Sequence, residues 1–187
     1  HSLAGRVKAM RSLVFSGLRD PEMRRVALAV AAGDTWTLRD FASRHGYRPL
    51  DLAGLRSCAA RDDLCELGNF FNFVRNNVRY TGDLTGIDTY TAARRTLFEM
   101  RGGDCDDHFI AHATLAGHNG FGVIARCVAA RGVVDASGRP VIGHIYAVAL
   151  VEKFNPTRGV ALDTTLPGSA ALGTEPDHVE RRDFRVL

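Results

Sequence analysis

Cys105 stands where a reactive thiol is expected. Gly102 and Gly103 allow the chain to turn tightly before it, and Asp104 is a suitable cap for a helix that begins at Cys105. In the first turn of a helix, unpaired backbone N–H groups and the positive end of the helix dipole favour a thiolate over a thiol. The sequence therefore predicts a nucleophilic cysteine at the start of a buried helix.

A nucleophilic thiol needs a base and a group that orients the base. His144 lies at the start of the apolar segment IYAVALV, and Asp163 is the only carboxylate of a second apolar segment that ends in two threonines. If the chain folds back at Asn155-Pro156, the segments are adjacent strands and His144 lies beside Asp163. Cysteine, histidine and aspartate in this order can form a thiolate–imidazolium pair held by a carboxylate. We therefore expect these three residues to be catalytic, and Cys105 to react below about pH 8.

Asp104, Asp106 and Asp107 surround Cys105 with negative charge. They could bind Ca²⁺, but helix capping and complementation of the helix dipole are the simpler interpretation, so we expect no metal. The same carboxylates oppose thiolate formation, whereas a nearby histidine and the helix N-terminus favour it. The sequence leaves the sum of these effects open.

His108 and His112 have the i, i+4 spacing of half a zinc site on a helix. Phe109 stands where a zinc protease motif of the type HExxH has its glutamate, so the metalloprotease interpretation fails. His108 is one turn from Cys105, and a base on the same helix would leave little room for a substrate. We expect His108 to be exposed or to support the site near the substrate. We expect His112 to pack where the helix contacts the rest of the fold.

The remaining cysteines have no reactive surroundings. Cys127 lies in the apolar run VIARCVAA and is expected to be a buried strand residue. Cys58 and Cys65 are seven positions apart on a stretch predicted to be helical. On a continuous helix they would be about 10 Å apart, too far for a disulfide, which would require a break in the helix between them.

Composition excludes several classes of protein. The chain has 187 residues, of which 45% are hydrophobic and 24% charged, and its net charge is only +3, with basic and acidic residues mixed. Nucleic-acid binding is therefore not indicated, and no apolar run approaches the roughly 20 residues of a membrane span. The chain begins with His1 rather than Met, so its natural N-terminus is not visible. The cytoplasm is slightly favoured as the compartment. No cofactor is expected.

The periodicity of the first hundred residues is mostly helical. Residues 3–32 form two helices separated at Asp20-Pro21, a short helix covers 37–46, and a longer one begins near Asp62 and ends near residue 80. A turn-rich segment covers 81–91, and Thr91 caps a short helix that leads to the glycines before Cys105.

After Gly120 the sequence becomes rich in β-branched residues. Three strands separated by turns are predicted at 122–134, 143–154 and 160–165. They form an antiparallel meander packed against the Cys105 helix, which makes the fold α+β in a single domain covering 1–187. We expect a helical lead over 1–65, a core over 66–166 and a tail over 167–187, the tail being a loop with a short edge element or a segment ordered by docking.

The segments RGGDCDDH, GFGVIARCV, GHIYAVALV and GVALDTT together resemble the transglutaminase-like superfamily of papain-type cysteine enzymes, in its bacterial and phage branch. The likeness covers roughly residues 70–166, and the first 65 residues show no resemblance. It implies a papain-like core in which Cys105 is the nucleophile, His144 the base and then the acid, and Asp163 the orienting residue.

The likeness is incomplete at the oxyanion hole. In the animal enzymes of this superfamily a tryptophan completes that hole, but no tryptophan lies just before Cys105 here. Tyr80 or a backbone group would have to serve, with the Cys105 N–H as the other donor. Asp104 and His108 are the remaining residues expected near the substrate.

The expected reaction is acyl transfer from an amide or peptide carbonyl through a thioester. Water as acceptor gives a protease or deamidase, and an amine gives cross-linking; hydrolysis is favoured, with a protein or peptide as substrate. RGG-x-C also resembles the arylamine N-acetyltransferases, but the two aspartates after the cysteine, the longer helical lead and the lack of an obvious coenzyme A site oppose that alternative. A non-enzymatic interaction domain, such as a phage or secretion-apparatus component that docks through its helical N-terminal third, is the other alternative.

Overall fold

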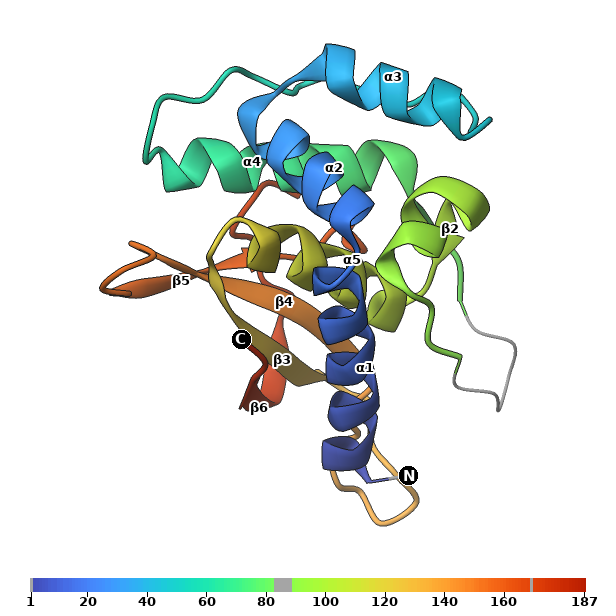
Figure 1. Ribbon diagram of the computed structural model, residues 1–187. Coiled ribbons are helices and arrows are strands. Elements are labelled where there is room, and N and C mark those ends of the chain that lie inside the picture. The colour runs from blue at the N-terminus through green and yellow to red at the C-terminus, as the bar shows by residue number, and fades with distance from the viewer. Residues whose placement is uncertain (1, 83–88, 169) are drawn as a thin grey trace.

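The computed structural model describes residues 2–82, 89–168 and 170–187, and it is α+β, as predicted (Figure 1). The predicted turn-rich segment at 81–91 lies largely outside the described residues. None of the helices in the described ranges is long and apolar enough to cross a membrane. The N-terminal part contains the helices α1 (Leu3–Leu18), α2 (Pro21–Ala32), α3 (Thr35–Arg44) and α4 (Asp63–Asn77).

These helices begin where short polar side chains can cap them. Asp20 caps α2 by accepting from two backbone N–H groups, and Pro21 is the first residue of this helix. Gly33, at φ 68°, ends α2 in a left-handed conformation. Asp34 caps α3 through the N–H of Thr37 at 3.0 Å. The helix predicted to start at residue 37 therefore starts two residues earlier.

The chain between α3 and α4 corrects the expectation for Cys58 and Cys65. Asp62 caps α4, so Cys58 lies in an irregular segment before the helix and Cys65 lies in its first turn. The Cα atoms are 5.6 Å apart and the two residues form a disulfide. The predicted continuous helix is wrong because the aspartate cap stops it, and this break permits the bond.

Asparagine side chains on α4 bind this irregular segment. Asn69 Nδ2 donates to the carbonyls of Ala31 and Arg56 at 3.0 and 2.8 Å, and its oxygen accepts from the Arg56 N–H at 2.9 Å. Asn77 exchanges similar bonds with the backbone of Asp51 at 2.9 and 2.7 Å. The amides thus satisfy backbone groups that have no strand or helix to pair with.

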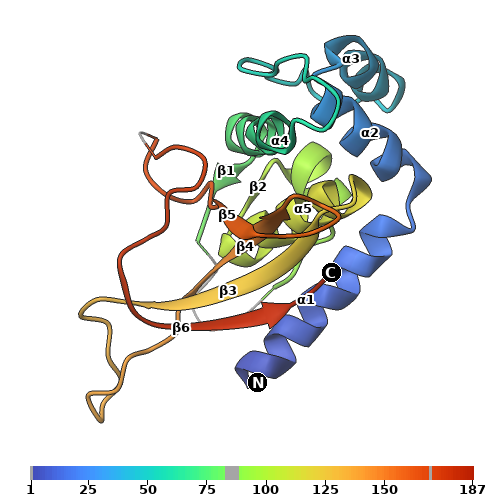
Figure 2. The same ribbon diagram turned by 90° about the vertical axis from the view of Figure 1, so that its left-hand side faces the viewer.

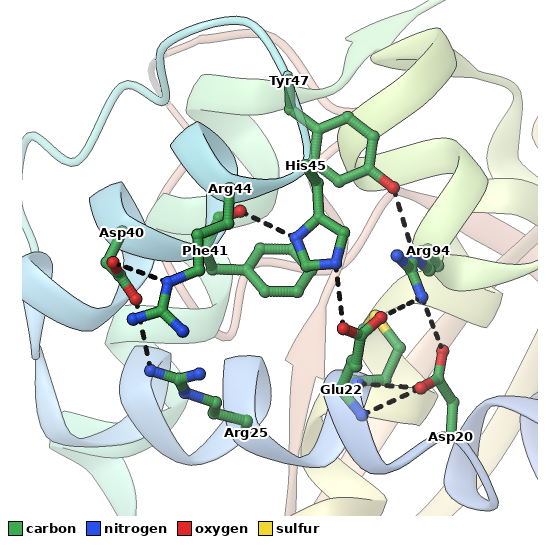
Figure 3. Close-up of polar contacts among 10 residues, drawn as sticks. Asp20, Glu22, Arg25, Asp40, Phe41, Arg44, His45, Tyr47 and Arg94 are labelled. Carbon is green, nitrogen blue, oxygen red and sulfur yellow. Dashed lines mark hydrogen bonds and ion pairs between the residues drawn. The ribbon is translucent and has the colours of Figure 1, made fainter.

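Arg94 and Glu22 join the helical part to the segment that leads to Cys105 (Figure 3). Glu22 on α2 pairs with His45 Nε2 at 2.9 Å and with the guanidinium of Arg94. Arg94 Nε also donates to the hydroxyl of Tyr47 at 3.2 Å. The end of α3 and the chain before the cysteine are therefore fixed to the same carboxylate.

The sheet has the order β5-β4-β3-β6 and is antiparallel throughout. Its strands are β3 (Gly122–Ala130), β4 (His144–Val151), β5 (Arg158–Leu162) and β6 (His178–Arg185). The predicted meander is therefore present with shorter strands. Of the two alternatives for the tail, the loop with an edge element is present, and this element, β6, has eight residues and pairs with β3 along most of its length.

Helix α5 (Cys105–His118) lies between the sheet and the N-terminal helices (Figure 2). It packs on β3 and β4 on one side and on α1, α2 and α4 on the other. Eleven of its residues are buried, from Asp106 to Ala116. The buried environment predicted for the cysteine helix is present.

A small parallel pair of strands sets the start of α5. β1 (Arg79–Tyr80) pairs with β2 (Gly102–Gly103), and the N–H of Thr81 donates to the carbonyl of Gly103 at 2.9 Å. The predicted short helix before these glycines is a π-helical segment, η1 (Arg95–Met100), which ends at Arg101 with φ 52°. The sequence analysis missed the strand pair, because two residues are too few for a periodic signal.

Candidate active site

The first turn of α5 has the capping geometry predicted for it. Asp104 Oδ1 accepts from the N–H groups of Asp106 and Asp107 at 3.0 and 3.1 Å. A Cβ atom on Gly103 would lie 2.5 Å from the Cβ of Asp107, so the residue two before the cysteine has no room for a side chain. Cys105 is the first residue of the helix and is partly buried.

His144 and Asp163 lie at neighbouring strand ends. His144 begins β4 and Asp163 directly follows β5, in the register that pairs Ala147 with Leu162. The distance between His144 Nε2 and Asp163 Oδ2 is 2.7 Å. The side chain of Asp163 is fully buried, whereas that of His144 is 22% exposed. The expected pairing of the two side chains is therefore present.

Thr165 holds the other oxygen of the Asp163 carboxylate. Its N–H and its hydroxyl both donate to Oδ1, at 3.1 and 2.6 Å. Burial raises the pKa of Asp163, but the hydrogen bond and charge of His144, with both bonds from Thr165, outweigh burial and lower the pKa below its ordinary value. The carboxylate is thus ionised and fixed in orientation.

Cys105 and His144 line one small cavity of about 10 Å³. The thiol lies 3.9 Å from Asp106 Oδ1, and the backbone N–H of Ile145, the residue after His144, donates to the sulfur. Burial, followed by the charge of Asp106, raises the pKa of the Cys105 thiol to about 12. This direction is opposite to the one expected from the helix terminus, because loss of water outweighs the favourable dipole.

Arg6 of α1 also reaches this cavity. Its guanidinium lies 3.2 Å from Asp106 Oδ2, and the Asp106 side chain is 1% exposed. Leu3 and Met10 of the same helix line the cavity with it. One buried carboxylate thus contacts both the thiol and a helix from the far end of the sequence.

His108 is buried, so of the two positions expected for it, exposed or supporting the site, the exposed one is wrong. Its Nδ1 lies 2.7 Å from the hydroxyl of Thr164, and His112 Nε2 lies 3.0 Å from the same oxygen. Burial lowers the pKa of His108 to about 4 and that of His112 to about 3. Both rings are therefore neutral, and they fix the residue that follows Asp163. His112 is buried where α5 packs on the chain after β5, as expected of a helix-packing residue.

Tyr80 lies beside the site but is half exposed, at 51%. Its backbone pairs with Gly103 through β1 and β2, and its ring approaches that of His108 edge-on with centroids 6.2 Å apart.

The three aspartates of the first turn have separate roles. Asp104 caps the helix, Asp106 binds Arg6, and Asp107 accepts from the N–H of Thr91 at 2.7 Å. Within the described ranges, no group of three or more His, Cys, Asp or Glu side chains is arranged to hold a metal ion. Asp104 is thus seen in the capping role that we ranked above Ca²⁺ binding.

No family model, curated protein or solved structure matches this chain. The resemblance to transglutaminase-like enzymes therefore rests on the sequence segments quoted above. Any function must be argued from the geometry of the site.

The sequence analysis missed Arg6, Thr164 and Thr165. The two threonines carried a signal, because hydroxyls directly after a buried aspartate can hydrogen-bond back to its carboxylate. Arg6 carried none, since it is 100 positions from Asp106 and lies on an ordinary helix face.

Proposed function

We propose that this protein transfers acyl groups from an amide or peptide carbonyl to water or an amine, through a thioester on Cys105. The observation that carries the proposal is the His144–Asp163 pair, joined at 2.7 Å, whose histidine lines the same cavity as a cysteine at the first position of a buried helix. The α+β fold supports the finer proposal of a transglutaminase-like, papain-type core over residues 66–166.

The reaction follows from the groups in the cavity. His144 accepts the Cys105 proton while the sulfur bonds to the carbonyl carbon, and the C–N bond then breaks as His144 returns the proton to the leaving amine. In the second half, His144 takes a proton from water or an acceptor amine, the new bond forms at the carbonyl, and the sulfur leaves and regains a proton. Asp163 bonds Nε2 of His144, which leaves Nδ1 as the atom that exchanges protons.

The first turn of α5 can stabilise the oxyanion. The N–H of Cys105 belongs to the first helical residue, where a backbone amide has no partner within the helix. Tyr80, held beside the cysteine by the pairing of β1 with β2, is the proposed second donor. Because water is always present, hydrolysis is the favoured outcome of the thioester.

An activated small ester, such as p-nitrophenyl acetate, tests the proposal without a known substrate. We expect the acyl group to appear on Cys105 in peptide mass maps and to turn over, faster when an amine is added. Cys105→Ser and His144→Ala should abolish turnover. An acyl group that appears only on Lys or Cys127, or turnover that survives His144→Ala, would contradict the proposal.

Asp163→Asn is the sharpest control. The two donors of Thr165 face one oxygen of residue 163, so an asparagine must place its oxygen there and its NH₂ toward His144 Nε2. Nε2 must then accept a hydrogen bond from this NH₂, so the proton of the neutral ring moves to Nδ1. A protonated Nδ1 can no longer take a proton from the thiol. We expect turnover to fall on the order of 10⁴-fold, as for an amide replacing the carboxylate of a catalytic triad.

A second candidate is a non-enzymatic interaction domain, with the helical lead over 1–65 as its docking surface. The pKa of Cys105, raised to about 12, favours it, because such a thiol is a poor source of thiolate at neutral pH. Failure of acyl turnover in every variant, with the fold intact, would select this candidate.

A further inference from the structure

Helix α1 packs on α5, and the contacts between them follow the same order along both helices. Arg6 meets Asp106 at the start of the two helices, and a Cβ on Gly17 would lie 2.8 Å from Thr114 farther along them. The first two turns of α1 consequently lie over the N-terminus of α5. That is the end of α5 that bears Cys105.

The cavity around the thiol is too small for a substrate. At about 10 Å³ it has room for roughly one water molecule, and Leu3, Arg6 and Met10 of α1 form part of its wall. An amide with a substituent on each side is several times larger. In this conformation the sulfur is therefore closed to the substrates of the proposed reaction.

A larger hollow lies directly outside this wall. It has a volume of about 290 Å³, near the lower end of ligand pockets at roughly 300 Å³. Leu3, Arg6 and Ile142 line both spaces, so the start of α1 stands between them. Movement of these few residues would join the hollow to the thiol cavity. The hollow is lined by Leu3, Arg6, Pro140, Ile142, Glu180 and Arg182.

The two ends of α1 are held differently. The first turn contains Gly5, a weak helix former, and no acidic residue to complement the helix dipole. Residues 3–6 are held through polar groups, by the hydrogen bond from the Gly5 N–H to the Ser2 cap and by the ion pair of Arg6, whereas Val7 and Met10 after them are buried in the core. The last turn packs closely on α5, and its Gly17 carbonyl accepts from His118 Nε2 at 3.1 Å.

We propose that residues 3–6 are an autoinhibitory cover, which must move away from Cys105 before an amide or peptide substrate can reach the thiol. This inference rests on the proposed function, because a cover has a role only if the thiol attacks a substrate. The last turns of α1 stay on α5 and the start of the helix swings or unwinds from them. Opening also brings water to the thiol and removes the burial that is the main cause of its raised pKa.

Two thiol reagents of different size test the cover on the full chain. Methyl methanethiosulfonate is small, and a maleimide carried on polyethylene glycol is large. Both react with the thiolate, so the ratio of their rates at one pH reports access and is independent of the pKa. In the wild type we expect the large reagent to be at least about tenfold slower, relative to the small one, than with a free peptide thiol, because it needs local opening.

Arg6→Glu should open the cover by placing a second negative charge against Asp106. The rate ratio should then approach that of the peptide thiol, and Arg11→Glu, the same charge change on the exposed side of α1, should leave it at the wild-type value. If Arg6→Glu fails to fold, Arg6→Ala carries the same test. A wild-type ratio equal to that of the peptide, or one unchanged by loss of Arg6, overturns the proposal.

The p-nitrophenyl acetate assay on the same variants separates the two proposals. Loss of size selectivity in Arg6→Glu together with faster acyl turnover supports both. Loss of size selectivity without turnover supports movement of residues 3–6 but removes their autoinhibitory role, and the proposed function fails. Turnover in the wild type with no size selectivity supports the function and overturns the cover.

Discussion

The pH dependence of Cys105 gives a quantitative test of the closed site. With the pKa raised from 9.0 to about 12, the thiolate fraction at pH 8 falls about a thousandfold. A thiolate of higher pKa is more nucleophilic, and a Brønsted coefficient of about 0.45 over three units returns about a 20-fold gain. The net expectation is that Cys105 attacks a disulfide-type reagent about 50-fold more slowly than an ordinary thiol at pH 8.

The measurement uses methyl methanethiosulfonate between pH 7 and 9.5, with peptide mass mapping and circular dichroism to verify the fold. A peptide with the sequence of residues 101–108 is the matched reference, because it keeps the acidic neighbours and loses the burial. The rate at Cys105 should rise about tenfold per pH unit without levelling off, whereas the peptide should begin to level off. A rate at pH 8 equal to that of the peptide would refute the reasoning, and so would a rate at Cys105 that levels off below pH 8. It would mean that a thiolate–imidazolium pair already exists.

Two predictions concern stability. Cys65→Ser opens a loop of about eight residues, which should lower the free energy of unfolding by about 2.5 kcal/mol and the melting temperature by about 5–10 °C. The disulfide assignment is wrong if the native wild type shows four titratable thiols. The neutral His108 and His112 should make the fold acid-sensitive: their pKa values of about 4 and about 3 lie below the unfolded value near 6.5. The stability that they contribute is present above about pH 6.5 and lost as the pH falls, about 2 kcal/mol each by pH 5. Urea unfolding at pH 7.5 and 5 should show this loss, and His112→Gln should reduce it; equal stability at both pH values would contradict the burial of the rings.

The fold was predictable where the sequence carries local signals. Aspartate caps, the Asp20-Pro21 break, and the β-branched residues of the central strands with the turns between them marked most elements close to their observed limits. An edge element was expected in the tail, but the position and length of β6 were not predictable, because its residues HVERRDFR alternate weakly and one edge of the strand faces solvent. The start of α4 was placed correctly, but the stretch before it was extended as a helix past its cap.

The site was predictable in part for the same reason. The neighbouring positions of His144 and Asp163 follow from a hairpin, which is a local feature of the sequence. The contact between Arg6 and Asp106 joins residues 100 positions apart and depends on how two helices pack. The pKa of Cys105 depends on the same packing, so a local analysis gave the wrong direction.

The disulfide bears on the compartment. Disulfides form and persist mainly in oxidising surroundings. The bond between Cys58 and Cys65 therefore opposes the cytoplasm that the sequence alone favoured. Thiol titration of protein from its native source would settle which of the two indications holds.

The charges of β6 have a consequence for the behaviour of the molecule in solution. β6 is an outer strand of the sheet, and a strand in that place offers unpaired backbone groups to other chains. Its Arg181, Arg182 and Arg185 stand among Glu180 and Asp183, so a second copy approaching side by side would have to strip water from many charges. The charged residues that weaken the alternation of β6 thus also oppose the addition of a further strand at this edge.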